Sequence, residues 1–311
     1  MNVYTKFGGT YKWDPVRNLH FEDLTDTRND IDLHIGKETS VPVNSDSINV
    51  FLDLEQPNTW YGGPTCRAFR NAKSREETFD KIYTINKPVA NKRNAILGEK
   101  KYVYTFFPFS LKHLPAQSTK VYNAFFSGHW YGNKYCLQRE IIGPAWQNLK
   151  KTIQGFDFFI VSGYHEGRNL SYDEKLAENA KSKISIAYNH QEFGSRFNDM
   201  LPSIKAEYTD VEKDSTGHLC INQHKARVIE GFMSKTLVLV YNDPFNSIED
   251  FWTPDEHFIY YSNAAELESK IADINENYNS DKYQNIINAG HEFTKAEFSV
   301  EQFYNKYIKD L

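Results

Sequence analysis

The chain has 311 residues, of which 40% are hydrophobic and 25% charged, a composition typical of a globular protein long enough for two domains. Its formal net charge of −5 disfavours nucleic acid as a partner, because proteins that bind phosphate backbones usually carry a basic face. No stretch approaches the roughly 20 apolar residues of a membrane span, and the N-terminus has no signal-peptide pattern. We therefore expect a cytoplasmic protein with no membrane span.

Short apolar runs bounded by turn residues predict strands that are buried on both faces, as in a parallel sheet. In chain order they cover residues 48–53, 81–85, 102–106, 121–126, 156–161, 183–188 and 236–241. Helix-start signals accompany them: Ser171, Asn263 and Ser299 each precede a Glu or Gln by three residues, as in a capping box. Strands that alternate with helices predict an α/β fold. Turn residues interrupt the pattern over residues 1–45, where only the alternation of Ile31, Leu33 and Ile35 indicates a short strand.

A polar, proline-containing stretch at 112–119 separates two of the predicted strands. Because it has no periodicity, we interpret it as an interdomain linker. The predicted domains are residues 1–118 and 119–311.

The segment 221–241 is typical of a loop, a helix and a buried strand. Gln223 and Lys225 come just before the helix, and Arg227 and Glu230 are three residues apart on it, so that they share a face. A helix N-terminus beside a cation favours a diphosphate, and the guanidinium fork suits phosphate oxygens. A carboxylate one turn deeper can accept both hydroxyls of a ribose. The alternative is an Arg–Glu pair on the surface of an amphipathic helix.

Two acids, Asp53 and Glu55, follow the apolar run 48–52. The carboxyl ends of strands line the ligand crevice of open α/β sheets, and an acid there can take a proton from an attacking hydroxyl. We expect Asp53 to be the catalytic base and Glu55 to be the second choice. The alternative is an acid that ends a strand and caps a turn.

Small residues also follow a predicted strand, at Ser127 and Gly128. They would allow backbone N–H groups to approach a phosphate. His129 and His165 lie at similar positions. We expect His129 to contact the donor or the acceptor and His165 to lie near the nucleobase, with ordinary loop histidines as the alternative.

The run Gln223, Lys225, Arg227, Val228 and Glu230 resembles the donor-site signature Q-x-K-x-R-V-x-E of the group 1, CgeB-like glycosyltransferases. The resemblance extends over most of residues 120–311. It implies a GT-B fold, with two Rossmann-like domains facing across a cleft and the last helix packing back toward the first domain. It also implies transfer of a sugar from a UDP- or GDP-sugar, held by the second domain, to a hydroxyl acceptor on the first, predicted to be a glycan.

The chain is also similar, more distantly, to the DNA β-glucosyltransferases of T-even phages. Their donor helix has an R-x-x-E that matches Arg227 and Glu230, and their catalytic base matches Asp53. This similarity further implies phosphate contacts at Ser127, Gly128 and Lys134.

Retaining GT-B enzymes carry a second Glu eight positions before the ribose Glu, where this chain has Asn222. This departure favours an inverting reaction. The D-x-D at Asp30 and Asp32 lies outside the predicted donor domain, so we expect no metal and no cofactor besides the nucleotide sugar. Two other functions stay open: phage-type glycosylation of a DNA base, and a non-catalytic module that binds nucleotide sugars.

Overall fold

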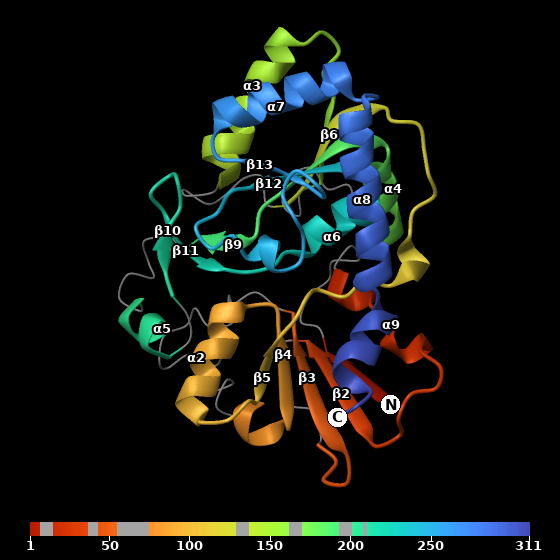
Figure 1. Cartoon of the computed structure of the whole chain (residues 1–311), viewed down its shortest axis with the longest axis vertical. Helices are drawn as coiled ribbons and strands as arrows, with labels where there is room; N and C mark the ends of the chain where they lie inside the picture. Colours follow the sequence, from red (N-terminus) through yellow and green to blue (C-terminus); the bar gives the residue numbers. More distant parts are fainter. Residues whose placement is uncertain are drawn as a thin grey trace.

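The structure is a computed structural model that describes residues 1–6, 15–36, 43–54, 75–128, 137–161, 170–192, 201–207 and 210–311. Two parallel sheets with their helices form an N-terminal and a C-terminal half, one below the other in Figure 1. The predicted α/β class is confirmed.

The N-terminal half is built on five parallel strands in the order β1-β2-β3-β4-β5. They are β1 (Asn2–Lys6), β2 (Ile31–Gly36), β3 (Ile48–Asp53), β4 (Lys81–Thr84) and β5 (Tyr102–Tyr104). The strands β3, β4 and β5 confirm the apolar runs, and β2 confirms the short alternating strand at Ile31, Leu33 and Ile35, whereas β1 was not predicted. The register places Asp53 opposite Thr84, so both residues end their strands at the same edge.

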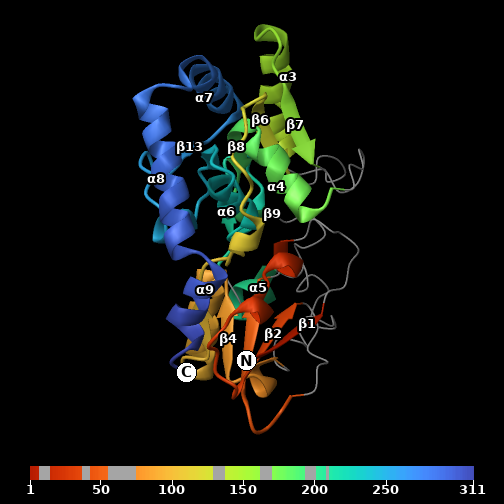
Figure 2. The ribbon, with the colours of Figure 1, turned by 90° about the vertical axis from the view of Figure 1, so that its right-hand side faces the viewer.

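Different parts of the chain cover the two faces of this sheet. Helix α2 (Lys87–Leu97) packs on one face through Val89 and Ala90. The other face is covered by α9 (Val300–Phe303) and the π-helical turn η8 (Tyr304–Ile308), where Phe303 lies 5.6 Å from the ring of Tyr83. The short 3-10 turns η1 (Pro15–Asn18) and η2 (Phe21–Asp23) add to the same core. Figure 2 shows α8 (Asp281–Glu297) leading into α9 along one side of both halves.

The C-terminal half has a second parallel sheet with the strand order β13-β12-β8-β6-β7. Its strands are β6 (Tyr122–Ser127), β7 (Phe158–Val161), β8 (Ser182–Ala187), β12 (Leu237–Tyr241) and β13 (Ile259–Tyr261). From β6 the chain adds β7 on one side and then returns to add β8 on the other. The strand order therefore reverses between β6 and β8, and their carboxyl ends form the switch point where open α/β sheets bind ligands.

Helices cover both faces of this sheet, as two separate apolar clusters show. The turn η5 (Gln138–Ile142), α3 (Gly143–Thr152) and α7 (Ala264–Asn277) lie on one face. The other face carries α4 (Tyr172–Ala180) and α6 (Ala226–Met233), with α8 (Asp281–Glu297) packed on α6. The predicted caps form: the side chains of Ser171, Asn263 and Ser299 each accept a hydrogen bond from the backbone N–H three residues on.

A small antiparallel sheet stands beside the main C-terminal sheet, in the order β10-β11-β9. It consists of β9 (His190–Glu192), β10 (Glu212–Lys213) and β11 (Leu219–Asn222), with α5 (Leu201–Glu207) beside it in Figure 1. The sequence did not predict these strands. The loop after β11 leads directly into α6.

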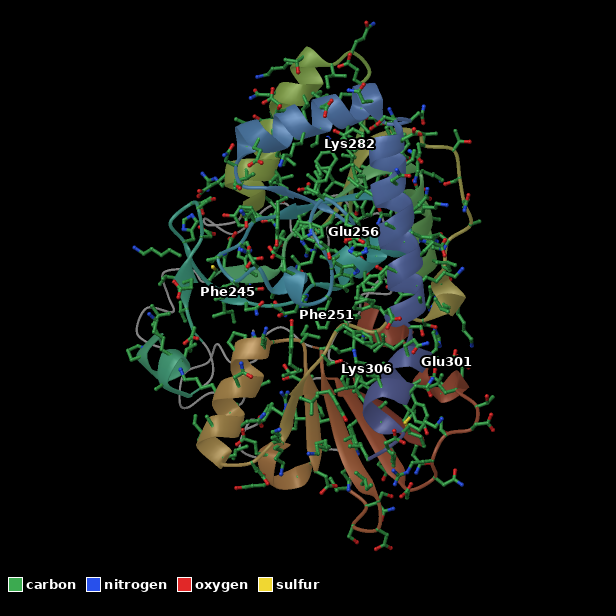
Figure 3. All side chains as sticks on the ribbon, in the orientation of Figure 1. Phe245, Phe251, Glu256, Lys282, Glu301 and Lys306 are labelled. Atoms are coloured by element: carbon green, nitrogen blue, oxygen red, sulfur yellow. The ribbon has the colours of Figure 1, made fainter. Side chains whose placement is uncertain are left out.

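The chain passes between the halves in two places that are hydrogen-bonded together. The backbone N–H of Phe109 donates to Phe298 O at 2.9 Å, and the N–H of Val300 donates to Phe109 O at 3.0 Å. The predicted linker contains a short turn, η4 (Leu111–His113), and otherwise no helix or strand. Phe251 follows the turn η7 (Ser247–Asp250) and lies between the halves (Figure 3), 5.3 Å from the ring of Tyr104. One continuous apolar cluster therefore spans both halves.

Candidate functional site

Lys225 is the N-cap residue of α6 and is 8% exposed. Its Nζ donates to the amide oxygens of Gln191, at 3.2 Å, and Gln223, while its backbone N–H donates to Asn189 Oδ1. Among the described residues, no carboxylate forms an ion pair with this ammonium. Burial, together with the nearby Arg227, holds the pKa of Lys225 well below its usual range.

Arg227 lies one residue into α6, and its guanidinium stacks 4.2 Å from the ring centre of Tyr188 and 5.5 Å from that of Phe126. These two aromatic residues stand at the carboxyl ends of β8 and β6, so Arg227 lies at the switch point. Stacking fixes the plane of the guanidinium fork. Its Nη1 is buried and has no hydrogen-bond partner in the part of the chain that the structure describes.

Gly128 follows the last residue of β6 and lies directly beside this guanidinium. A Cβ at this position would lie 2.8 Å from the ring of Phe126 and 3.2 Å from Arg227 Nη1. A side chain there would displace the arginine, so the close approach requires glycine. Ser127, which precedes it, is also buried.

The start of α6 thus collects positive charge and hydrogen-bond donors that lack an acceptor. Two basic side chains lie close together, the helix has no side-chain N-cap, and the first-turn N–H groups of a helix lack intrahelical partners. Buried polar groups are nearly always paired. Gln223, Lys225, Arg227, Ser127 and Gly128 all lie at the start of α6, which makes it the candidate site for an anionic ligand.

Glu230 has a different environment, one turn deeper on α6. It is 3% exposed, and its Oε1 accepts a hydrogen bond of 2.6 Å from Nζ of Lys175 in α4, which is equally buried. The alternative of a surface Arg227–Glu230 pair is therefore wrong. Arg227 turns toward the end of β8, whereas Glu230 faces α4, so the two side chains do not meet.

Asp53 ends β3 at the edge of the N-terminal sheet, as predicted, and is 7% exposed. Arg75 Nη1 lies 3.4 Å from its Oδ2, and the same guanidinium packs over the ring of Phe51 at 4.6 Å. The carboxylate is therefore held in place by a buried cation. Sequence reasoning missed Arg75, because no local spacing connects it with Asp53.

The same edge of the N-terminal sheet contacts the loop before α6. Asn86, which caps α2, donates from Nδ2 to Asn222 O, and the backbone N–H of His224 donates to Ile85 O at 3.4 Å. Asn222 Oδ1 is buried without a partner among the described residues. The candidate base and the candidate anion site thus lie on parts of the two halves that touch. The remaining predicted site residues, Glu55, His129, Lys134 and His165, lie outside the described residues.

His224 is buried in this contact, and its Nε2 lies 2.6 Å from the hydroxyl of Tyr104. That hydroxyl donates to Asp250 Oδ2 at 3.1 Å, and Lys87 pairs with the same carboxylate. Burial lowers the pKa of His224 to about 4, so the imidazole is neutral near pH 7.

A family model described as glycosyl transferase-like matches residues 126–309, which is more than half of the chain. No curated protein sequence matches the chain. Within the described residues, no helix combines the length and the apolar character that crossing a membrane requires.

Similar solved structures share the fold at low sequence identity. HepE from Anabaena, in complex with UDP and glucose, has a TM-score of 0.54 at 9% identity, covering 88% of this chain and 76% of its own. A glycosyltransferase from Rickettsia africae has a TM-score of 0.52 at 12% identity, covering 90% and 76%. TarM from S. aureus, solved with UDP, has a TM-score of 0.51 at 10% identity; 89% of this chain is covered, but it spans only 54% of TarM. The chain therefore belongs to the glycosyl transferase-like family, and its two facing parallel sheets have the GT-B fold.

Proposed function

We propose that this protein transfers a sugar from a nucleoside-diphosphate sugar, with UDP as the favoured nucleotide, to a hydroxyl group of a glycan acceptor. Family membership supports transfer of a sugar. The structures of HepE with UDP and glucose and of TarM with UDP support a uridine donor.

The observation that carries this proposal is the unmatched positive charge at the start of α6. Lys225 meets only amide oxygens, and Arg227 Nη1 meets no acceptor among the described residues. A diphosphate bound there would accept hydrogen bonds from both side chains and from the first turn of the helix. Gly128 leaves room for a phosphate to come close to the guanidinium.

In the proposed reaction, the acceptor hydroxyl oxygen attacks the anomeric carbon while the bond from that carbon to the diphosphate breaks. The electron pair of the broken bond stays on the diphosphate, where Lys225 and Arg227 stabilise the new charge. The hydroxyl proton passes to Asp53, whose carboxylate Arg75 holds in place. Glu55 is the second choice for the base, and Glu230, positioned by Lys175, is assigned to the ribose.

Calorimetric binding of UDP to Arg227→Lys tests the proposal. A lost bidentate contact to a charged group costs about 1.5–3 kcal/mol, so affinity should fall by roughly 10–100-fold. Arg139→Lys, the same change at an exposed position, is the matched control and should bind as the wild type does. If both variants bound UDP with equal affinity, the proposed binding of the diphosphate at the start of α6 would be wrong.

The same titrations also measure whether protons are taken up when UDP binds. A bound diphosphate raises the lowered pKa of Lys225, so binding of UDP should take up protons in the pH range between the pKa of the free site and that of the complex. Calorimetry in buffers with different ionisation enthalpies measures this uptake. GDP and GDP-sugars, titrated in parallel, decide between the two nucleotides.

A further inference from the structure

A second group of buried polar atoms without partners lies in the small antiparallel sheet. His190, at the start of β9, is fully buried, and neither ring nitrogen has a hydrogen-bond partner among the described residues. Its Nε2 lies 3.6 Å from Glu192 Oε1 and 3.8 Å from Asp214 Oδ2. Asp214 Oδ2 also has no hydrogen-bond partner in the part of the chain that the structure describes. Leaving these atoms without partners in the interior is costly.

These three side chains lie close enough together for one atom of each to bind the same metal ion. One ligand atom from each of His190, Glu192 and Asp214 lies within 4.8 Å of the other two. Nitrogen and oxygen ligands bind Zn²⁺ at about 2.0–2.2 Å, which places tetrahedral ligand atoms about 3.3 Å apart. The two distances from His190 Nε2, 3.6 Å to Glu192 and 3.8 Å to Asp214, exceed that spacing by a few tenths of an ångström.

Neighbouring groups already hold the three side chains toward one another. Asp214 Oδ1 accepts hydrogen bonds from the backbone N–H groups of Thr216 and His218, at 2.9 and 3.0 Å, which leaves Oδ2 directed to His190. Glu192 Oε1 accepts from the N–H of Leu137 at 2.6 Å. Outer contacts of this kind orient the ligands of metal sites.

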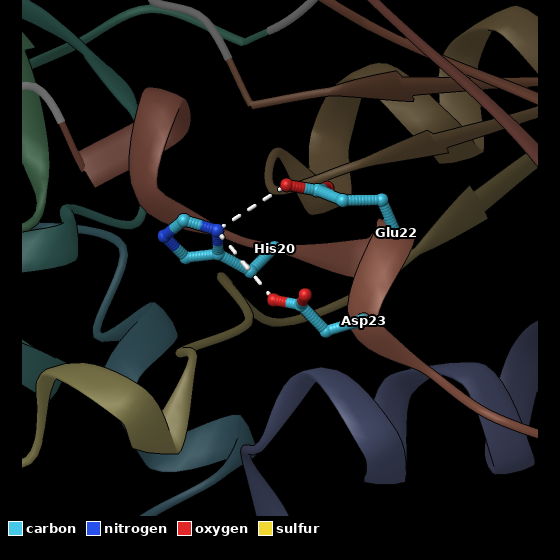
Figure 4. Close-up of side chains that lie close together, drawn as sticks. All are labelled: His20, Glu22 and Asp23. Carbon is cyan, nitrogen blue, oxygen red and sulfur yellow. Dashed lines mark hydrogen bonds and ion pairs between the residues drawn. The ribbon is translucent and has the colours of Figure 1, made fainter.

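A second cluster of similar composition does not share these properties. His20 lies 3.2 Å from Glu22 and 3.6 Å from Asp23 (Figure 4), but these carboxylates are 58% and 40% exposed. The other ring nitrogen of His20 meets His113 at 2.9 Å, and Asp23 pairs with Lys112. This cluster is an exposed ion-pair network and serves as a control.

We propose that His190, Glu192 and Asp214 bind one divalent transition-metal ion, with Zn²⁺ the best match to this ligand set. The ion has a structural role. It ties β9 to the hairpin of β10 and β11, and β11 pairs with β9 through Asn222 and His190. Because Gln191 of β9 also accepts from Lys225, the ion stabilises the loop that leads into α6 without touching the diphosphate.

The test titrates Zn²⁺ into chelator-stripped wild type and into His190→Asn, Glu192→Gln and His20→Asn, followed by calorimetry and thermal melting. We expect one equivalent per chain and a rise of several degrees in the melting temperature for wild type and His20→Asn. Both effects should be lost in His190→Asn and Glu192→Gln. If the variant of the fully buried His190 does not fold, the isosteric Glu192→Gln still tests whether zinc binding depends on this cluster.

Absence of stoichiometric zinc binding in the wild type overturns the proposal. So does binding that survives in a folded Glu192→Gln or His190→Asn, or binding that His20→Asn alone abolishes. UDP affinity, measured on the same zinc-free protein, reports on the proposed transferase separately, because its phosphate groups bind other residues.

Discussion

Helix α6 carries buried charges in opposite situations at its start and one turn further along. In the body of the helix, Glu230 meets Lys175 of α4, and each charge is neutralised by the other. At the start of the helix, Lys225 and Arg227 meet no carboxylate among the described residues. The number of charged residues is similar in both places. The difference teaches that a balanced pair of buried charges is stable without a ligand, whereas unbalanced buried charges indicate where a ligand of opposite charge would bind.

The variant with the largest expected effect changes Asp53, in the N-terminal half. Its pairing with Arg75 resembles the balanced, structural case, yet we assign it the role of base. Asp53→Asn should lower turnover by about 10²–10⁴-fold, the contribution of a general base, with UDP affinity nearly unchanged. Steady-state kinetics and calorimetry on one preparation measure both. Turnover within a few-fold of wild type, with donor binding intact, would assign Asp53 a structural role, and Glu55→Gln would then test the second choice.

Glu230→Ala removes one partner of the balanced pair. Lys175 would then be left as a buried charge without its acid, so the free energy of unfolding should fall by about 3–5 kcal/mol, measured by urea denaturation. The matched control is Glu178→Ala, which breaks the partly exposed pair with Lys181 and should cost at most about 1 kcal/mol. A Glu230 variant of normal stability that no longer binds UDP would place Glu230 in the donor site alone.

Burial of His224 makes the stability of the folded protein depend on pH. Its pKa of about 4 in the folded protein lies below the unfolded value of 6.5, so between these pH values only the unfolded chain takes up the proton. Stability should therefore fall as pH drops from 6.5 to 4, by up to about 3 kcal/mol. Thermal melts of wild type and His224→Gln across this range measure the effect, which the variant should lack. An equal slope in the variant would assign the titration to other groups.

Lys225→Met removes a cation that has no acidic partner among the described residues, whereas Glu230→Ala removes one half of a buried ion pair. No described carboxylate pairs with Lys225, so its removal leaves no unpaired buried acid there. The free energy of unfolding should therefore change by no more than about 1 kcal/mol, while UDP binding weakens. Lys175→Met, the same substitution in the balanced pair, should destabilise the fold strongly. Equal stability losses in the two variants would break the comparison.

The smallest expected effect is that of a chelator. Because protein groups neutralise the proposed diphosphate, transfer should continue in EDTA at temperatures well below the melting temperature. Activity that disappears in EDTA at such temperatures, and returns with Mg²⁺ or Mn²⁺, would place a metal ion at the diphosphate. A lower melting temperature in EDTA is expected from the zinc site alone.

The sequence predicted what local patterns determine. Apolar runs located seven strands of the two large sheets, and the start of α6 at Lys225 was readable from its spacing. Strand β2 was harder to recognise, because its Asp32 and His34 are polar although they are buried. The three strands of the small sheet are short and carry polar residues, so no apolar run marked them.

The partners of charged residues lay beyond local patterns. Lys175 precedes Glu230 by 55 positions, and Arg75 follows Asp53 by 22, so only the packing of α4 on α6 and the return of the chain to β3 bring them together. Asn86 was within reach, because an Asn followed by a proline in the first turn marks the start of α2.

The hydroxyl of Tyr83 donates to the carbonyl of Tyr307, a residue 224 positions later, where α9 and η8 cover one face of the first sheet. During synthesis, the N-terminal strands leave the ribosome long before this cover exists. Their apolar face, which includes Leu33, Val50 and Leu52, stays open until nearly the whole chain has been made. Closing so long a loop is slow, and exposed strands are prone to aggregate. The half that is translated first is thus completed only after α9 and η8 have been made, and its strands stay open to misfolding contacts in the nascent protein until then.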